Sequence, residues 1–222
     1  EKSKQGQSFR KLVLYELNNQ RSKQTQLNKA NFDTLCHLFN AFLSGCARES
    51  ADVSNAKMLM ILSQTFYSVD QEGEDGNDAK PSTEDSTTKD RQSRIYVKSK
   101  ICHHDIWSDE DFWDQAVYQC VSESLAKSGV LLNYVKSSSI KDGKMVGGNP
   151  KWHDLSPDEY AGAAAQVHSV VFAQLGTLSH SMMELGCGIP RACNFVRRLS
   201  IRYQLPLSLR ITLIQHLTKR NT

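Results

Sequence analysis

The sequence predicts an all-α protein of about seven or eight helices, packed as an antiparallel bundle or a short α–α superhelix, with a disordered acidic loop. Two observations support this fold class. Apolar residues recur at spacings of three and four along most of the 222 residues, which is the spacing of one helix face. Capping residues and glycine stops bound several of these stretches. We expect a single helical domain over residues 1–222, interrupted by a mobile acidic loop at 70–93.

Three amphipathic helices are expected before the acidic loop. The first covers residues 7–21, the second begins near Asn28, which is a good N-cap, and the third covers 53–68. Their apolar faces are expected to consist of Phe9, Leu12, Val13 and Leu17, then of Phe32, Leu35, Leu38, Phe39, Phe42, Leu43 and Cys46, and then of Ala56, Leu59, Leu62 and Phe66.

The acidic loop has the composition of a disordered segment. Residues 70–91 contain eight acidic and three basic residues, and Ala79 is their only hydrophobic residue. Such a segment cannot bury enough apolar surface to offset the entropy of ordering. Because the whole chain has a formal charge of +3, the remainder carries +8 and is distinctly basic. A solubilising insertion and a regulatory segment both fit this composition.

After the loop, residues 94–107 fit either a helix or a strand. A helix is favoured because the neighbouring segments are helical and a strand here would have no evident partner. The next helix is expected at 108–129, with Ser108 and Asp111 in a capping-box pattern. Its buried face is expected to consist of Phe112, Trp113, Ala116, Val117, Cys120 and Val121.

The clearest helix begins at Ser156, where Pro157 occupies the first helical position and Glu159 completes a capping box. Its apolar face steps by three or four residues until Gly186 and Gly188 end the helix. That face consists of Tyr160, Ala164, Val167, Val171, Leu175, Leu178, Met182 and Leu185.

The long helix also has a second apolar face about 120° from the first, formed by Ala165, Phe172, Gly176 and Met183. A helix that is apolar on two sides is expected to be buried between neighbours, as a central spine. Gly176 costs about 1 kcal/mol relative to Ala in a helix, so we expect another helix to cross closely at this point. Two shorter helices follow, at 189–203 and 208–219.

The polar residues of the long helix raise the question of catalysis, because Ser179, His180 and Ser181 are adjacent. A Ser–His–acid triad also needs an orienting carboxylate and an oxyanion hole. Adjacent helical residues diverge by about 100°, so Ser179 is not presented to His180, and Glu184 points outward along the same helix. We expect His180 to form hydrogen bonds across a helix interface, and we expect no enzymatic activity. A deep polar pocket holding His103 or His180 beside a carboxylate would revive the enzyme hypothesis.

Metal and nucleotide sites are disfavoured, and we expect no cofactor. Cys102, His103 and His104 are consecutive, but zinc needs three or four convergent ligands and adjacent histidines diverge. The glycines of 186–188 follow a helix rather than a strand and lack the lysine of a phosphate-binding loop.

The rest of the composition favours a cytoplasmic protein. The six cysteines lie in apolar stretches without a C-x-x-C motif, which favours buried thiols in a reduced compartment. No apolar run approaches the ~20 residues of a membrane span, and no segment resembles a signal peptide. Because the chain begins at Glu1 rather than at a methionine, we expect it to be part of a longer protein.

Four arginines are the candidate partner- or lipid-binding residues. Arg191, Arg198 and Arg202 lie within about 40° of one another on the 189–203 helix, and Arg210 follows in the next helix. This face could bind an acidic protein, anionic headgroups or the chain's own acidic loop, and an ordinary solvated face is the alternative. Nucleic acid is disfavoured, because the pI of about 8.5 is low for such a domain and no recognised motif is present.

Three stretches carry a family pattern: NFDTLCHLFNAFLSGCARESADVSNAKMLMILSQTFY, RIYVKSKICHHDIWSDEDFW and VFAQLGTLSHSMMELG. The local signatures are Ile106, Trp107, Phe112 and Trp113 in one segment and Phe172, Gln174, Leu175, Gly176, Thr177 and His180, followed by Met182 or Met183, in the other. These stretches resemble the SET-binding-factor domain. That module occurs in DENN-containing, myotubularin-related pseudophosphatases and in a related brain-enriched cytoplasmic protein. The likeness spans most of 27–217 outside the acidic loop.

The resemblance implies an all-helical, non-catalytic module in proteins that regulate membrane traffic and Rab-type GTPases. This chain shows no DENN or phosphatase segment, so the resemblance does not imply exchange activity. We therefore expect a cytoplasmic scaffold or effector that binds a protein partner, such as a Rab-type small GTPase. The alternative is a peripheral protein of vesicle membranes that recognises anionic lipid through the basic helix face.

Overall fold

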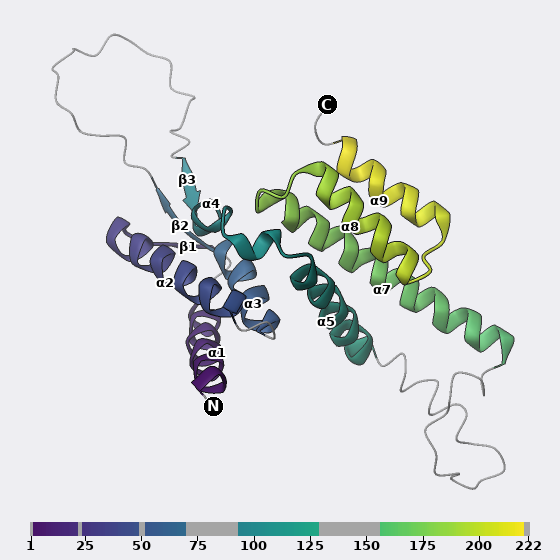
Figure 1. The fold of residues 1–222 in the computed structure, drawn as a ribbon, viewed down its shortest axis with the longest axis horizontal. Coiled ribbons are helices and arrows are strands. Elements are labelled where there is room, and N and C mark those ends of the chain that lie inside the picture. The colour runs from purple at the N-terminus through teal and green to yellow at the C-terminus, as the bar shows by residue number, and fades with distance from the viewer. Residues whose placement is uncertain (1, 22–23, 49–51, 70–92, 129–155, 220–222) are drawn as a thin grey trace, which may run out of the picture. The chain divides into compact units, whose positions relative to one another are not determined.

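The computed structural model describes residues 2–21, 24–48, 52–69, 93–128 and 156–219. Contacts divide the chain into two compact units, Glu1–Ile106 and Trp107–Thr222. The described residues form eight α-helices and one small three-stranded sheet (Figure 1), so the predicted all-α fold of seven or eight helices is confirmed. The single domain stays a prediction. The predicted acidic loop at 70–93 lies, apart from Ser93, outside the described residues.

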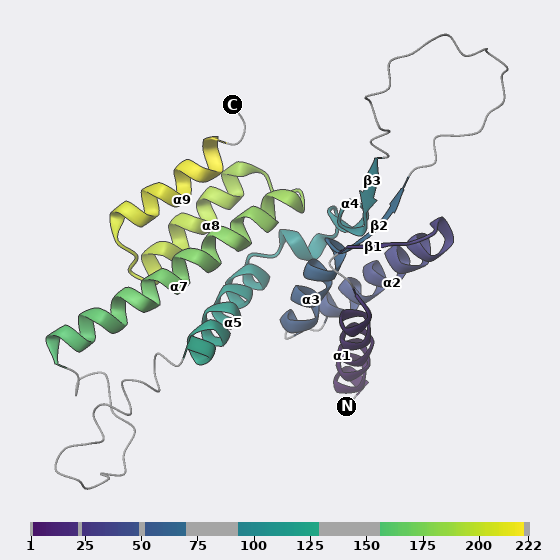
Figure 2. The ribbon, with the colours of Figure 1, turned by 180° about the vertical axis from the view of Figure 1, so that it is seen from behind.

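The first unit combines four helices with the small sheet. Its elements are α1 (Lys2–Gln20), β1 (Thr25–Gln26), α2 (Lys29–Arg48), α3 (Val53–Ser63), β2 (Phe66–Val69), β3 (Arg94–Tyr96) and α4 (Val97–Ile101). Strand β2 is central, pairing in parallel with β1 and antiparallel with β3 (Figure 2). The predicted faces of the second and third helices are buried, except that Leu38 is half-buried. Asn28 caps α2 as predicted, because its Oδ1 accepts from the Asn31 N–H at 2.8 Å.

The predicted secondary structure of this unit is wrong at two places. Helix α3 ends at Ser63 instead of continuing to 68, and residues 94–107 begin as a strand instead of a helix. The residues after α3 form strand β2, and β2 pairs with β3. In this pair, Tyr67 lies opposite Tyr96 with ring centroids 5.5 Å apart. The local sequence pattern could not reveal this pairing, because the acidic loop separates the two strands and strand formation depends on the cross-strand neighbour.

The inward face of helix α1 matches the predicted one only in part, since Val13 and Leu17 are half-buried. Leu14 and Arg10 are buried, whereas Phe9 and Leu12 of the predicted face are 60% and 67% exposed. The reason is an ion pair at the N-terminus of α3, where Asp52 Oδ2 lies 2.8 Å from Arg10 Nε and 2.7 Å from its Nη2. A guanidinium is buried only with such a partner, so the pair determines which face of α1 points inward.

The second unit consists of four helices: α5 (Glu110–Ser128), α7 (Pro157–Glu184), α8 (Ile189–Arg202) and α9 (Leu207–Lys219). Helices α7, α8 and α9 lie side by side, each antiparallel to the preceding one, as Figures 1 and 2 both show. Helix α7 also packs against α5, so it is the central helix of this unit as predicted. Its predicted second face is only half-buried at Phe172, Gly176 and Met183, and Ala165 is exposed. The predicted main face is buried from Val171 onward, whereas Tyr160 near the start of α7 is 55% exposed.

Both ends of the long helix follow the predicted signals. Ser156 Oγ accepts from the Glu159 N–H at 3.3 Å, and Glu159 Oε2 accepts from the Ser156 N–H at 2.9 Å, which is a complete capping box. After the helix, Gly186 adopts a φ of 84°, a left-handed conformation that favours glycine. The Cys187 N–H then donates to the Met182 carbonyl at 2.9 Å and closes the helix end.

The predicted capping box of the next helix is wrong. Asp109 Oδ1, not Ser108, accepts from the Asp111 N–H, at 2.9 Å. Ser108 instead ends a turn of 3-10 helix, Asp105–Ser108, that precedes α5.

An aromatic cluster forms the core where α5 begins. The Trp107 ring centroid lies 5.4 Å from that of Phe112 and 6.1 Å from that of Trp113, and the Trp113 and Phe195 centroids are 6.3 Å apart. The Trp107 carbonyl accepts from Trp113 Nε1 at 2.9 Å and from the Cys187 thiol at 3.0 Å. Burial raises the pKa of Cys187, although Arg191 lowers it, so the thiol keeps the proton that it donates.

Gly176→Ala is expected to raise the free energy of unfolding by about 0.5–1 kcal/mol, because glycine is disfavoured inside a helix. Helix α9 crosses here as predicted, but the crossing leaves room for a methyl group. A Cβ at this position would lie 3.6 Å from Leu213 Cδ2, which is an ordinary van der Waals contact. Urea denaturation followed by circular dichroism measures the change.

Gly45→Ala in α2 is the matched comparison, and it is expected to lower the free energy of unfolding. Its Cβ would lie 2.7 Å from Arg10 Nη1, so the guanidinium would have to move away from Asp52. If both Gly176→Ala and Gly45→Ala raised the free energy of unfolding, the close approach of the Arg10 guanidinium to Gly45 would be contradicted.

Candidate functional site

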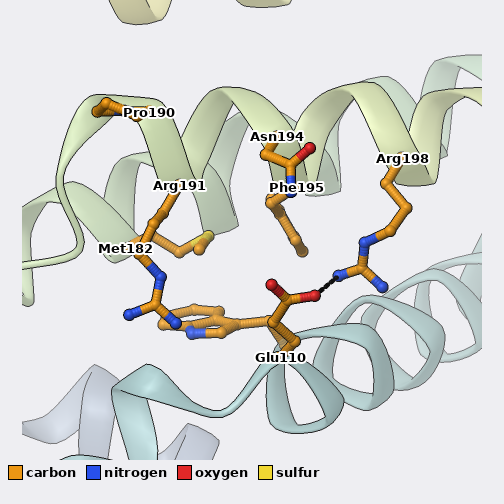
Figure 3. A pocket seen from close by; sticks show the side chains of 8 residues that line it. Glu110, Met182, Pro190, Arg191, Asn194, Phe195 and Arg198 are labelled. Atoms are coloured by element: carbon orange, nitrogen blue, oxygen red, sulfur yellow. Dashed lines mark ion pairs between the residues drawn. The ribbon is translucent and has the colours of Figure 1, made fainter.

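A cleft between the beginning of α5 and α8 is the candidate site of the second unit (Figure 3). It has a volume of about 200 Å³. Its lining consists of Glu110, Trp113, Met182, Pro190, Arg191, Asn194, Phe195 and Arg198. Trp113 and Phe195 are buried members of the aromatic cluster, so part of the cleft wall is apolar and belongs to the packed core.

Charged side chains bridge the two helices along this cleft. Arg198 Nη1 lies 2.7 Å from Asp114 Oδ2, and its Nη2 lies 3.3 Å from Glu110 Oε2 (Figure 3 marks the second contact). Arg202 Nη1 lies 3.7 Å from the same Asp114 oxygen. Glu110 and Asp114 are one turn apart on α5, so both face α8. Arg198 Nε and Asp114 Oδ1 are buried without a hydrogen-bond partner among the described residues, so the bridge has unused hydrogen-bonding capacity.

The other two predicted arginines have different roles. Arg191 Nη2 donates to the Ser108 carbonyl at 2.7 Å, which ties α8 to the residues before α5. Arg210 Nε donates to the Leu205 carbonyl at 2.5 Å and supports the turn between α8 and α9. Two of the four candidate residues, Arg198 and Arg202, therefore pair with α5. Arg191 bonds to Ser108, just before the helix N-terminus, and Arg210 does not join them. Binding of a partner or of lipid by these four residues stays a prediction.

The acidic half of this bridge, Glu110 and Asp114, was not predicted from the sequence. The sequence pattern predicts Trp113 in the core but predicts neither a cleft beside it nor the pairing of the arginines with α5. A usable signal was present, because Glu110 and Asp114 are four residues apart, as are Arg198 and Arg202. Matching charge spacings on two amphipathic helices indicate that the helices pack with those faces together.

The two serine hydroxyls that flank His180 on α7 bond to the backbone of their own helix. Ser179 Oγ donates to the Gly176 carbonyl at 3.1 Å, and Ser181 Oγ donates to the Thr177 carbonyl at 3.2 Å. Both buried hydroxyls are thus satisfied by their own helix. His180 Nε2 lies 3.6 Å from Glu184 Oε1, one turn along α7, so this contact runs along the helix. The predicted hydrogen bond of His180 across a helix interface stays a prediction.

The consecutive residues Cys102, His103 and His104 do not converge. The Cys102 thiol donates to the Ser99 carbonyl at 3.2 Å, His103 is exposed, and His104 Nε2 lies 3.1 Å from Ser44 Oγ. In the part of the chain that the structure describes, no three His, Cys, Asp or Glu side chains are grouped to hold a metal ion.

His104 is expected to make the first unit less stable as the pH falls below about 6.5. Its Nδ1 accepts from the Ile106 N–H at 3.2 Å, which requires the neutral ring. Burial lowers the pKa of His104, and Asp105 opposes this shift. The unfolded chain therefore binds the proton first, so the contribution to stability is complete above the unfolded pKa and is lost as the pH falls through the lower folded pKa.

Urea denaturation of the wild type and of His104→Gln at about pH 7.5 and about pH 5.5 tests this prediction. The destabilisation caused by the substitution is expected to be smaller at the lower pH. His103→Gln controls for the loss of a histidine as such. An unchanged difference between wild type and His104→Gln at the two pH values would refute the role of His104.

Comparisons of this chain with protein-family models, with curated proteins and with solved structures give no match. The resemblance to the SET-binding-factor domain therefore stays a prediction. Among the described residues, no helix has both the length and the apolar character that crossing a membrane requires.

Proposed function

We propose that this chain is a non-catalytic protein-interaction module, and that the cleft between α5 and α8 docks a short acidic segment of a partner protein. The supporting observation is the combination of Arg191 and Arg198 with the apolar surface of Trp113 in one cleft. A partner carboxylate bonds to the guanidinium groups while a neighbouring apolar side chain packs against the apolar wall of the cleft, where Pro190 is exposed. Small-molecule sites typically enclose ~300–1,000 Å³, so a cleft of about 200 Å³ suits a single anchoring side chain better.

Glu110 occupies the place where the partner's carboxylate is proposed to bind. Its side chain is 61% exposed, and its oxygen lies 3.3 Å from Arg198 Nη2, so the ion pair is solvated and weak. An incoming carboxylate can replace it at Arg198 with little loss of stability, because Asp114 keeps Arg198 in place from the other side.

The resemblance supports membrane traffic or small-GTPase signalling as the setting of this interaction, in the cytoplasm, with a Rab-type GTPase as a candidate partner. Neither a metal nor a cofactor has a role in the proposed interaction. The module acts as a scaffold or effector, because docking alone accounts for the chemistry of the cleft.

Fluorescence anisotropy with a labelled peptide of alternating Glu and Leu residues tests the docking site. The wild type is expected to bind this peptide and not the matched peptide in which Gln replaces Glu. Arg191→Gln is expected to weaken binding roughly tenfold, since it removes a charge-assisted hydrogen bond. Glu110→Gln is expected to strengthen binding several-fold, because it removes the competing carboxylate. Arg197→Gln is the control, since this exposed arginine of the same helix does not line the cleft.

Equal binding of the Glu and Gln peptides would overturn the proposal. So would a Glu110→Gln variant that binds the acidic peptide more weakly than the wild type. Circular dichroism of each variant shows whether the helices have been retained.

A further inference from the structure

Three large aliphatic side chains are exposed around the turn that joins α8 to α9. Ile201 is 62% exposed, Leu207 is 68% exposed and Ile211 is 48% exposed. Leu207 and Ile211 are one turn apart on the same face of α9, and Ile201 lies in the last turn of α8, opposite the buried face of that helix. Single exposed apolar residues are common, but three around one turn indicate a contact surface.

The turn itself is fixed, so this exposure does not result from a loose loop. Leu205 is fully buried, and its N–H donates to the Ser200 carbonyl at 2.9 Å. Gln204 has a φ of 54° and donates its N–H to the Ile201 carbonyl at 3.0 Å. Arg210 holds the Leu205 carbonyl from the other side. Because Leu205 takes the interior position, the neighbouring aliphatic side chains are held outside.

The charged residues of the α8–α9 segment itself are all basic. Residues 189–219 contain five arginines, one lysine and no acidic residue. Arg197 is exposed one turn before Ile201, on the same side of α8. The Arg202 side chain, beside Ile201, is 71% exposed. Aliphatic side chains flanked by arginines match the boundary of an anionic bilayer, where the alkyl groups enter the acyl region and the guanidinium groups meet the phosphates.

We infer that Ile201, Leu207, Ile211 and Arg197 form a membrane-contact surface, the α8–α9 corner, which docks reversibly on anionic lipid. This assignment moves lipid binding away from the arginine face indicated by the sequence, since Arg198 and Arg202 are paired with Asp114 of α5. The corner and the cleft use different arginines, so lipid docking does not depend on the proposed peptide site.

Sedimentation with vesicles tests the corner. The wild type is expected to pellet with vesicles of equal parts phosphatidylserine and phosphatidylcholine, to remain soluble with phosphatidylcholine alone, and to dissociate at high ionic strength. Ile201→Ser combined with Leu207→Ser is expected to weaken partitioning roughly tenfold or more without changing the charge. Arg197→Gln is expected to weaken it several-fold. Tyr118→Ser combined with Tyr160→Ser is the matched control, since both tyrosines are exposed on other helices of this unit and their loss is expected to leave binding unchanged.

Wild-type partitioning by the Ile201→Ser, Leu207→Ser variant would overturn the inference, provided that circular dichroism shows a folded protein. Failure of the wild type to bind phosphatidylserine vesicles would also overturn it. Light scattering tests whether a second copy of the chain covers the corner instead of lipid. A wild-type protein that does not bind lipid but forms a dimer, which the Ile201→Ser, Leu207→Ser variant abolishes, would identify that second copy as the occupant. Arg191→Gln is expected to leave lipid binding unchanged, and Arg197→Gln is expected to leave peptide binding unchanged. The peptide-docking proposal and the lipid-docking proposal can therefore be refuted separately.

Discussion

Trp107→Ala is expected to lower the free energy of unfolding of the second unit by about 3–5 kcal/mol, the range typical of removing a buried aromatic side chain. Trp107 is the first residue of this unit and is 1% exposed. Its ring contacts Phe112 and Trp113, so its loss leaves a cavity beside the start of α5. Without the ring, the Trp107 backbone is less firmly held. The hydrogen bonds that its carbonyl accepts from Trp113 Nε1 and from the Cys187 thiol are therefore expected to weaken.

Urea denaturation followed by far-ultraviolet circular dichroism measures this loss. Tyr118→Ala is the matched control, because it removes an aromatic ring from α5 that is 67% exposed, and it is expected to change the free energy by less than about 0.5 kcal/mol. A Trp107→Ala loss no larger than that of the control would show that the aromatic cluster does not hold α5 in place.

Asp52→Ala is expected to lower the free energy of unfolding of the first unit by about 3–5 kcal/mol, because it leaves the Arg10 guanidinium buried without its partner. The side chains of Arg10 and Asp52 are only 8% and 1% exposed, so water cannot replace the lost carboxylate. Gln7 Nε2 and the Cys46 thiol also lose the acceptor that Asp52 provides, at 3.3 Å and 3.5 Å. No cap is lost, because the Asp52 side chain makes no capping hydrogen bond to α3.

A double-mutant cycle separates the ion pair from the packing around it. Arg10→Met combined with Asp52→Ala is expected to cost less than the sum of the single substitutions, since no charge is then left buried alone. Asp114→Ala provides the contrast in the second unit. The Arg198 side chain is 39% exposed, so breaking that pair is expected to cost only about 1 kcal/mol or less. Additive losses for Arg10 and Asp52 would argue against a coupled pair.

Elements with local signals were predicted well from the sequence. The faces of α2 and α7 repeat over several turns, and the capping box at Ser156 lies within four residues, so neighbouring residues carried the information. The pairing of β2 with β3 was missed, because it joins segments on either side of the acidic loop. The inward face of α1 was predicted only in part, because the distant carboxylate of Asp52 draws Arg10 inward, and Phe9 and Leu12 are left exposed.

The arginines of the candidate site were predicted from the sequence, but the carboxylates that pair with them were not. The spacing of Arg191, Arg198 and Arg202 placed them on one side of α8, and the structure agrees. Their surroundings depend on how α8 packs against α5, which no local pattern encodes. Arginines that suggested an open basic surface are therefore partly neutralised by Glu110 and Asp114.

The hydrogen bonds to the Trp107 carbonyl constrain how the chain can vary in length. That single oxygen is held by an indole six positions later and by a thiol from the turn between α7 and α8. Inserting or deleting one residue between Trp107 and Trp113 would rotate the indole by about 100° around α5 and take its N–H away from the acceptor. Evolution can therefore exchange side chains in this stretch far more readily than it can add or remove a codon.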